Sequence, residues 1–305
     1  MADAALIWVP FTLMAACAQV FRNAFQSRLA GRIGTLGGTQ VRFIFGLPFA
    51  AVFLGVLCLT TGQTLPSLSG DAMLWALLGS AVQIAATFLM LVVMQKRDFG
   101  VAYAYIKTEP VSVAIMGWVL IGDHLPALSV VAICIVTVGV VLASLRKGDG
   151  AAQLAEWKPL AVGVASGALF GLSAISFRAS IGALPEGGFV LRSLTMLVMT
   201  LGIQSAMLLS WFAFRDSAGL IGSLRQWRLS VPAGALGALA SAGWFIAFSL
   251  TQAANVRTLA LIEMPVVALV SRFVSGRWLS SRQLLGFAAI VAGVGLLMMA
   301  EAATG

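Results

Sequence analysis

Long apolar runs separated by short polar connections extend along almost the whole chain. Each run holds roughly 20 mainly apolar residues, the length that an α-helix needs to cross the hydrocarbon core of a bilayer. No run alternates apolar and polar residues with the period of two that a membrane β-strand shows. The pattern predicts ten helical spans, at residues 5–26, 35–60, 71–94, 100–121, 125–145, 158–180, 187–214, 229–254, 257–276 and 283–300.

The second half of the chain repeats landmarks of the first half at a distance of about 155 residues. The matching residues are Pro110 and Pro265, Gly122 and Gly276, Leu125 and Leu279, Gly139 and Gly293, Gln95 and Gln252, and Phe21-Arg22 and Phe177-Arg178. A half with five helices, an odd number, makes the second half enter the membrane from the opposite side. We therefore predict an all-α integral membrane fold, with ten transmembrane helices in two inverted five-helix repeats.

One connection resembles a linker, because it is polar, rich in glycine and close to the midpoint of the chain. It predicts three parts: a first five-helix repeat at 1–147, a linker at 148–157 and a second five-helix repeat at 158–305. The other connections are only a few residues long, so consecutive helices should be antiparallel neighbours.

The composition agrees with a membrane environment. Hydrophobic residues make up 60% of the chain and charged residues 10%, whereas a soluble domain has roughly 25% charged residues. Such a chain cannot cover its surface with polar groups, so we expect the lipid bilayer to surround it. This predicts a multi-pass protein of a bacterial-type inner (cell) membrane.

The net charge of +8 is spread over helix ends and short connections, without the dense basic patch that a nucleic-acid partner would require. Twelve of the 19 basic residues lie in odd-numbered connections, and among the even-numbered connections only the one ahead of the ninth span has a basic residue, Arg257. The positive-inside rule therefore predicts that the odd-numbered connections are cytoplasmic and both termini external. The twelve are Arg28, Arg32, Lys96, Arg97, Arg146, Lys147, Lys158, Arg215, Arg225, Arg228, Arg277 and Arg282.

The chain offers little for catalysis or for binding a cofactor. Cys17, Cys58 and Cys134 lie in three different apolar segments without metal-ligand spacing, and the single histidine, His124, lies in a short connection. An enzyme would need a clustered metal site or an activated nucleophile. We therefore predict no enzymatic activity, no metal and no cofactor.

Small residues recur at four-residue spacing on one face of two predicted helices. These are Gly163, Gly167 and Gly171 in one helix, and Gly234, Ala238 and Ala242 in the other. Such a face lets two helix backbones approach closely in lipid. We expect packing within the chain, with homodimerisation as the alternative, so the protein is a monomer or a homodimer.

Ionisable residues inside the predicted spans are the main candidates for a site, because each costs about 2.5–3.5 kcal/mol near the bilayer centre. In the fourth span Tyr103 and Lys107 share a helix face, and Glu109 lies on another. Pro110 cannot donate a backbone hydrogen bond, so the helix should break there and expose the Ile106 carbonyl. Polar backbone beside two charges suits a polar ligand.

The ninth span has a corresponding break at Pro265, with Glu263 just before it. When the two prolines are aligned, Met264 falls opposite Glu109 and Glu263 falls opposite Thr108, so the two carboxylates need not be symmetric. Burial disfavours a charged carboxylate, which makes both glutamates candidate carriers of protons as coupling ions. The structural alternative is that Glu109 pairs with a buried base such as Lys107 or Arg257.

Four arginines lie near the connections after the first and sixth spans. Arg22 and Arg42 form one pair, and Arg178 and Arg192 form the repeated pair. Each pair could attract anions at one mouth of the protein, or its side chains could reach to the membrane surface. Neutral candidates for hydrogen bonding and stacking are Gln83, Gln95 and Trp244, for which plain packing is the alternative.

A segment from the fourth span resembles a known family. Glu109-Pro110-Val111, followed by Gly-Trp-Val-Leu-Ile-Gly-Asp123 and a last helix with Gly139, is similar to the drug/metabolite transporter superfamily, and within it to the EamA-type ten-helix transporters. The chain departs from the family pattern where Asp123-His124 and Arg277-Trp278 replace a usual Glu-Arg. The resemblance also implies cytoplasmic termini, so the orientation stays open between it and the charge bias.

The resemblance implies alternating access through a cavity between the halves, lined by the first, third, fourth, sixth, eighth and ninth helices. These helices would contribute Arg22, Gln83, Tyr103, Lys107, Glu109, Arg178, Trp244 and Glu263 to substrate binding, with helix breaks at Pro110 and Pro265.

We therefore predict a secondary active transporter that exports or imports a small metabolite. Basic groups in the spans outnumber Glu109 and Glu263, which favours a substrate with a carboxylate, such as an amino acid or an organic acid. The basic groups are Arg22, Arg42, Lys107, Arg178, Arg192 and Arg272. The alternative within transport is proton-coupled efflux of lipophilic cationic drugs. A membrane-embedded enzyme or a partner subunit is the alternative of another class. The enzyme would need the clustered site described above, and a partner subunit would not require paired proline breaks.

Overall fold

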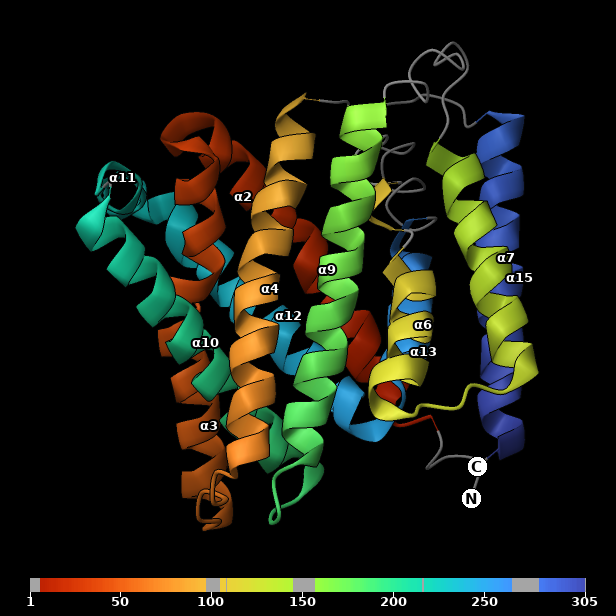
Figure 1. Ribbon diagram of the computed structural model, residues 1–305, viewed down its shortest axis with the longest axis horizontal. Coiled ribbons are helices and arrows are strands. Elements are labelled where there is room, and N and C mark those ends of the chain that lie inside the picture. Colours follow the sequence, from red (N-terminus) through yellow and green to blue (C-terminus); the bar gives the residue numbers. More distant parts are fainter. Residues whose placement is uncertain are drawn as a thin grey trace.

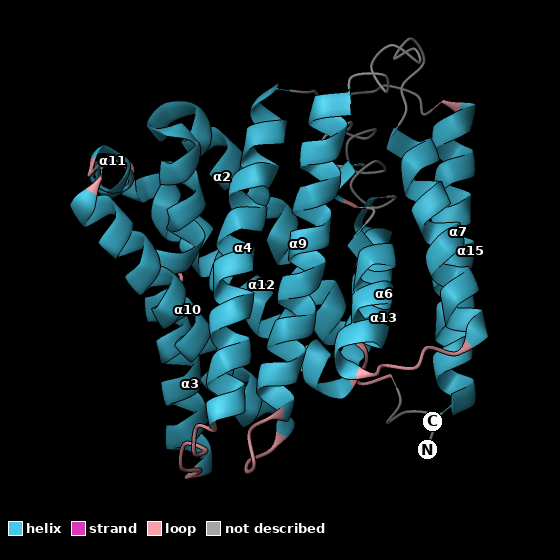
Figure 2. Cartoon of the chain, in the orientation of Figure 1, coloured by secondary structure: helices cyan, strands magenta, loops and turns pink. Residues whose placement is uncertain are grey.

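The computed structural model describes residues 6–96, 105–107, 109–144, 157–215, 217–264 and 280–304, and every regular element in these residues is a helix (Figure 2). In chain order the elements are α2 (Trp8–Ile44), α3 (Leu47–Thr61), α4 (Gly70–Lys96), α6 (Glu109–Ile121), α7 (Ala127–Ser144), α9 (Trp157–Gly182), α10 (Phe189–Phe214), α11 (Ala218–Arg225), α12 (Trp227–Leu250), α13 (Ala253–Leu259), the 3-10 helix η1 (Ala260–Ile262) and α15 (Ser281–Thr304).

The predicted class of an all-helical membrane protein is confirmed. In the described part of the chain, six helices are long and apolar enough to cross a membrane, and three shorter apolar helices accompany them. The six are Trp8–Thr61, Gly70–Gln95, Trp157–Gly182, Phe189–Phe214, Trp227–Leu250 and Ser281–Ala302. Helices suit this environment because they satisfy their backbone hydrogen bonds internally.

Helix α2 contains a sharp turn at Gly34, whose φ of 80° is outside the helical region. The side-chain amide of Gln26 donates to the carbonyl of Gly38 at 3.1 Å, although the two residues are 12 positions apart. Twelve residues of a straight helix would span about 18 Å, so the chain must fold back between them. Figure 1 shows this reversal at the upper edge, before the chain descends into α3. Glycine suits the turn because it adopts positive φ without strain.

The most extensive contacts between helices are those of α2 with α12, of α4 with α9, and of α7 with α15. Small residues make these contacts close: a methyl group added at Gly243 would lie 2.7 Å from the Phe11 carbonyl oxygen, and one added at Gly139 would lie 2.7 Å from that of Gly286. The short helix α11, which the hydropathy pattern did not predict, packs on α2 where Gly219 approaches Gly37.

The glycine face of α9 is used within the chain. A methyl group would lie 2.5 Å from the Tyr105 β-carbon at Gly163 and 2.6 Å from the Ile106 carbonyl oxygen at Gly167. Gly171 faces α6 in the same way. This face therefore positions the backbone next to Lys107.

We expect Gly167→Val to destabilise the protein by about 1–3 kcal/mol, because the new side chain must displace the Ile106 carbonyl. Gly202→Val in α10 is the matched control, since nothing lies within 4 Å of the position that its β-carbon would take. Both substitutions carry the same change in helix propensity. Unfolding in detergent, followed by circular dichroism, measures the difference, and equal stabilities would contradict the expected clash.

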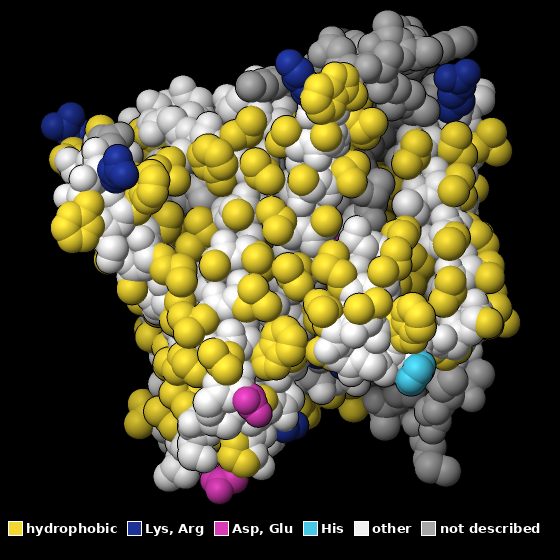
Figure 3. Space-filling model, viewed as in Figure 1, with side chains coloured by type: hydrophobic (Ala, Val, Ile, Leu, Met, Phe, Trp, Pro, Cys, Tyr) yellow, Lys and Arg dark blue, Asp and Glu magenta, His cyan; other side chains and the backbone are white. Residues whose placement is uncertain are grey.

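The outer surface is largely apolar and the interior contains many polar groups. Leu59 and Phe214 are 88% and 87% exposed, whereas Arg22 is 2% exposed. Figure 3 shows hydrophobic side chains over the middle of the visible face, with most visible lysines and arginines at the upper edge and acidic side chains at the lower edge. Helix α2 begins and α15 ends at this lower edge (Figure 1). The protein is thus a multi-pass integral membrane protein with separated charges at its two ends.

Candidate functional site

Two buried ion pairs join the segment at the start of α6 to α13 and the residue after η1. The Lys107 ammonium lies 2.6 Å from the Glu263 carboxylate, and the Arg257 Nε lies 3.0 Å from the Glu109 carboxylate. All four side chains are at most 8% exposed. Each pair takes one residue from each half of the chain, so these four residues, called here the central charged cluster, connect the halves through the interior.

Local backbone features present these charges. Lys107 lies in a turn, and α6 begins at Glu109 with Pro110 in its first turn, where the missing N–H of proline leaves no bond unmade. On the other side, Glu263 directly follows the tighter 3-10 turn of η1. The Lys107–Glu263 pair therefore forms where a turn of the first half meets the end of a 3-10 helix of the second half. The predicted residues Tyr103 and Pro265 lie outside the described residues.

Two aromatic rings hold the Arg257 guanidinium. Its central carbon lies 4.7 Å from the centre of the Trp244 ring and 5.3 Å from that of Phe248. The rings are nearly parallel, at 20°, and Trp244 donates its indole N–H to Gln19 at 3.2 Å. A desolvated cation over aromatic faces is stabilised by about 2 kcal/mol or more. Trp244, a predicted site residue, thus positions Arg257, which had been considered only as an ion-pair partner.

Arg22 and Arg42 add positive charge to this interior. They are 2% and 4% exposed, so their side chains do not reach the surface of the helix assembly. Both side chains approach Gly237 of α12. Arg42 also lies close enough to Arg22 and Arg257 for electrostatic repulsion between the three guanidinium groups. Arg42 donates to the hydroxyl of Thr87 at 3.3 Å. The first arginine pair is therefore an interior feature, in contrast to the mouth or the membrane surface where it was expected.

Neutral polar groups continue from Arg42 along α4. Gln83 is buried one turn before Thr87, accepts a hydrogen bond of 2.8 Å from Gln204 of α10, and has its own carbonyl bonded by the Thr87 hydroxyl. Gln95 lies apart, at the exposed end of α4, where it donates to the Ser27 carbonyl. Of the two glutamines, only Gln83 is connected to the buried charges.

Arg178 lies away from the central charged cluster, at the end of α9. It pairs with Asp123 at 2.8 Å, in the connection between α6 and α7, and donates to the Thr251 carbonyl at 3.1 Å. Burial raises the pKa of the Asp123 carboxyl, and the charge of Arg178 opposes this rise. The family resemblance implies that Arg178 lines the cavity, whereas the arginine pattern predicts a position near one mouth; Arg178 lies at the lower edge of the molecule.

A second polar network at this edge was missed by the sequence analysis. Glu301 of α15 accepts hydrogen bonds from the Thr251 hydroxyl at 3.0 Å and from the Asn255 amide at 2.6 Å. Thr251 also binds Arg178, so the network runs from α6 through α9 to α15. No local pattern marks Glu301, because it lies at the end of an ordinary apolar helix. The sequence did mark Arg257, because it is the one basic residue in the even-numbered connections of the predicted topology.

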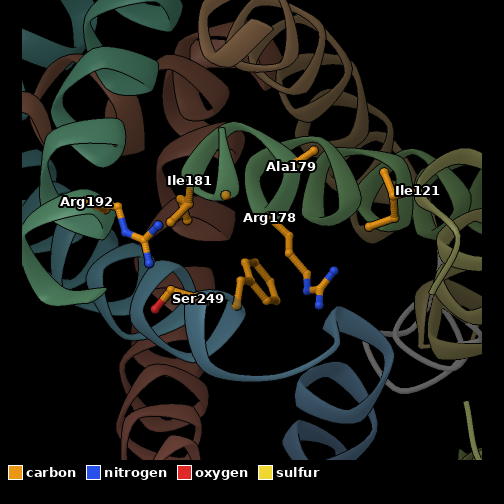
Figure 4. Close-up of a pocket in the computed structure, with 8 residues that line it drawn as sticks. Ile121, Arg178, Ala179, Ile181, Arg192 and Ser249 are labelled. Carbon is orange, nitrogen blue, oxygen red and sulfur yellow. The ribbon is translucent and has the colours of Figure 1, made fainter. Parts of the chain in front are cut away.

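A pocket of about 300 Å³ opens beside Arg178 (Figure 4). It lies between the end of α9, the start of α10 and the end of α12. Figure 4 shows the side chains of Arg178 and Arg192 extending toward the end of α12, where Ser249 lies. The lining residues are Ile121, Arg178, Ala179, Ile181, Gly182, Arg192, Phe248 and Ser249. Phe248 also contacts Arg257, so its ring lies between this pocket and the central charged cluster.

Within the described ranges, no group of three or more histidine, cysteine or acidic residues is arranged to hold a metal ion. The three cysteines are free thiols.

An apolar exterior around ion pairs that link two halves defines a multi-pass membrane protein with a polar interior. Residues 6–145 match the model of the EamA-like transporter family. The predicted resemblance to the drug/metabolite transporter superfamily is confirmed, and it indicates a membrane transporter.

A solved structure supports the fold over almost the whole chain. It is titled only "Crystal structure of protein", is 18% identical in sequence, and superimposes with a TM-score of 0.68 over 96% of this chain and 95% of that chain. Identity this low shows a shared fold and nothing about substrate. No curated protein sequence gave a significant match.

Proposed function

We propose that this protein is a secondary active transporter that moves a small carboxylate-bearing metabolite by alternating access between its two halves. The observation that carries the proposal is the central charged cluster, in which each ion pair spans the two halves of the chain. Movement of one half relative to the other would change the distances within these ion pairs. They are therefore suited to couple substrate binding to the motion.

The helix contacts support two inverted repeats, 1–147 and 158–305, joined by the linker at 148–157. If the first repeat matches the second helix for helix, α2 corresponds to α9 and α4 to α12. Exchanging the two repeats then turns the contact of α2 with α12 into that of α9 with α4, which is also present. The same exchange leaves the contact of α7 with α15 unchanged. This exchange pattern is expected of a two-fold relation. A chain that starts and ends at one edge also agrees with an even number of crossings.

A carboxylate substrate suits the energetics of the cluster. A buried ion pair is close to neutral in free energy when intact, but breaking it leaves a costly unpaired charge. A substrate carboxylate could replace Glu109 on Arg257, or Glu263 on Lys107, so that the base stays compensated, and the displaced buried glutamate would then take up a proton in place of its lost partner. The nearby charges of Arg22 and Arg42 would further favour an anion. The exchange thus allows the pairs to open at small cost.

One observation bears on the alternative substrate, a lipophilic cation. The rings of Trp244 and Phe248 are suited to hold a cation, but Arg257 already contacts both of them. A cationic drug would have to displace this guanidinium in an interior with several positive charges. Two glutamates remain as potential partners for it, so cations belong in the test.

We expect amino acids or organic acids to raise the thermal unfolding temperature of the purified protein, and cationic dyes to leave it unchanged. A ligand at 100 times its Kd stabilises the folded state by about 2.7 kcal/mol. The ligand-induced increase should vanish in Lys107→Ala and persist in Lys158→Ala, whose side chain stacks on the exposed Trp157. Stabilisation by cations alone would overturn the substrate class.

The orientation is proposed from the charges. The upper edge, which carries most of the visible basic residues, would face the cytoplasm of a bacterial-type inner membrane. The resemblance to EamA-type transporters implies the reverse. Exposed residues at the two edges, such as Arg228 above and Glu186 below, provide sites for cysteine labelling from one side of intact cells.

A further inference from the structure

The pocket at the lower edge contains two guanidinium groups in different states. Arg178 is paired with Asp123 at 2.8 Å. Arg192, by contrast, has no carboxylate within ion-pair distance among the residues that the structure describes. The one hydrogen bond that its guanidinium donates to a described residue is long, 3.5 Å to the Leu184 carbonyl, and its buried Nε has no acceptor there. Among the described residues, the pocket therefore contains one guanidinium that is paired with a carboxylate and one that is not.

Arg192 lines the pocket and is only partly buried, so its terminal nitrogens, and not the enclosed Nε, are the donors that a ligand in the pocket would contact. The planar fork of an arginine matches the two oxygens of a carboxylate. A bound carboxylate would therefore give this guanidinium a charge-assisted hydrogen bond.

The size and position of the pocket narrow the ligand further. A volume of about 300 Å³ is at the lower end of the range for sites that bind small molecules. The walls combine the two arginines with apolar groups such as Ile121, Ile181 and Phe248, so the ligand needs an acidic group and a short apolar part. A small organic carboxylate meets both conditions.

We propose that this pocket is an outer binding subsite for the carboxylate of a small organic anion, with Arg192 as its main contact and Arg178 as the second. The Phe248 ring separates it from the central charged cluster, because the ring lines the pocket and also packs against Arg257. Its role as a station on the transport path rests on the proposed function. Binding of the anion itself does not.

Arginine-selective labelling with phenylglyoxal, followed by mass spectrometry, tests binding in the intact purified protein. Acetate, succinate and benzoate are the probes, each compared with sodium chloride at equal ionic strength. We expect at least one of them to slow the modification of Arg192 several-fold and to leave the exposed Arg228 unchanged. Equal rates at Arg192 in all three carboxylates and in chloride would overturn the subsite.

Transport in proteoliposomes tests the role of the pocket, with the carboxylate that gives the largest thermal stabilisation as substrate. Arg192→Gln should raise KM by about tenfold, the loss expected for one charge-assisted contact, and should lower kcat much less. Arg192→Lys, which keeps the charge, should recover part of the affinity. Arg228→Gln is the matched surface control, and a thermal scan of each variant checks its folding.

The two proposals fail in different ways. If the wild type transports a carboxylate but Arg192→Gln has the KM of Arg228→Gln, the subsite has no part in transport and the proposed function stands. If the wild type transports no carboxylate, the proposed function fails, and the labelling of Arg192 still decides whether the pocket binds the anion.

Discussion

Arg257→Met should destabilise the protein by about 3–5 kcal/mol, because it removes the base that neutralises a buried carboxylate. Arg257 contacts Glu109 at 3.0 Å and lies against the rings of Trp244 and Phe248. The methionine fills a similar volume, so the lost charge dominates the effect. Unfolding of the purified protein in detergent, titrated with a denaturing detergent, gives the change in free energy.

A double-mutant cycle separates the ion pair from the loss of packing. Adding Glu109→Gln to Arg257→Met removes the uncompensated charge, so the double variant should regain a large part of the lost stability. Arg228→Met is the surface control, since Arg228 is exposed and stacks on Trp227, and it should change stability by about 0.5 kcal/mol or less. If Glu109→Gln and Arg257→Met add independently, the pair has no coupling energy and the central charged cluster loses its proposed role.

The second large effect concerns protons. We expect Glu109→Gln, Glu263→Gln or both to reduce accumulation driven by a pH gradient to the level of protein-free liposomes. Glutamine has nearly the same shape and cannot take up or release a proton, so substrate exchange without a gradient should persist. Uptake of the labelled substrate into proteoliposomes measures both quantities.

Glu186→Gln serves as the control, because Glu186 is an exposed residue at the lower edge. Full pH-driven uptake in both Glu109→Gln and Glu263→Gln would exclude these carboxylates as proton carriers. Transport would then depend on another coupling ion or on the substrate gradient, and the cluster would retain only its role in binding.

Much of the fold could be predicted because membrane helices leave a local signal. Lipid provides no hydrogen-bond partners, so any chain inside it must satisfy its backbone within one segment and present apolar side chains outward. The segment at 158–180 illustrates this, since its length predicts a span and its glycine spacing predicts a close contact. The structure has α9 at 157–182 with that face against Ile106.

The turn at Gly34 and the helix α11 show where local patterns end. The stretch around Gly34 is helical on both sides, and the reversal depends on contacts such as that between Gln26 and Gly38. Helix α11 is too short to give a clear apolar period, and its packing on α2 holds it in place.

The apolar runs and the repeat of Pro110 at Pro265 followed from residue order alone, and so did the presence of charges in the spans. Which charge meets which was decided by the tertiary structure. Lys107 pairs with Glu263, Arg257 pairs with Glu109 beside two aromatic rings, and Arg178 pairs with Asp123 at the edge. Hydropathy depends only on a short stretch of the sequence, so it predicts which segments enter the lipid. An ion pair depends on the rotation and depth of two segments far apart in the sequence, about 150 residues for the two central pairs, and these are set only when all the helices pack.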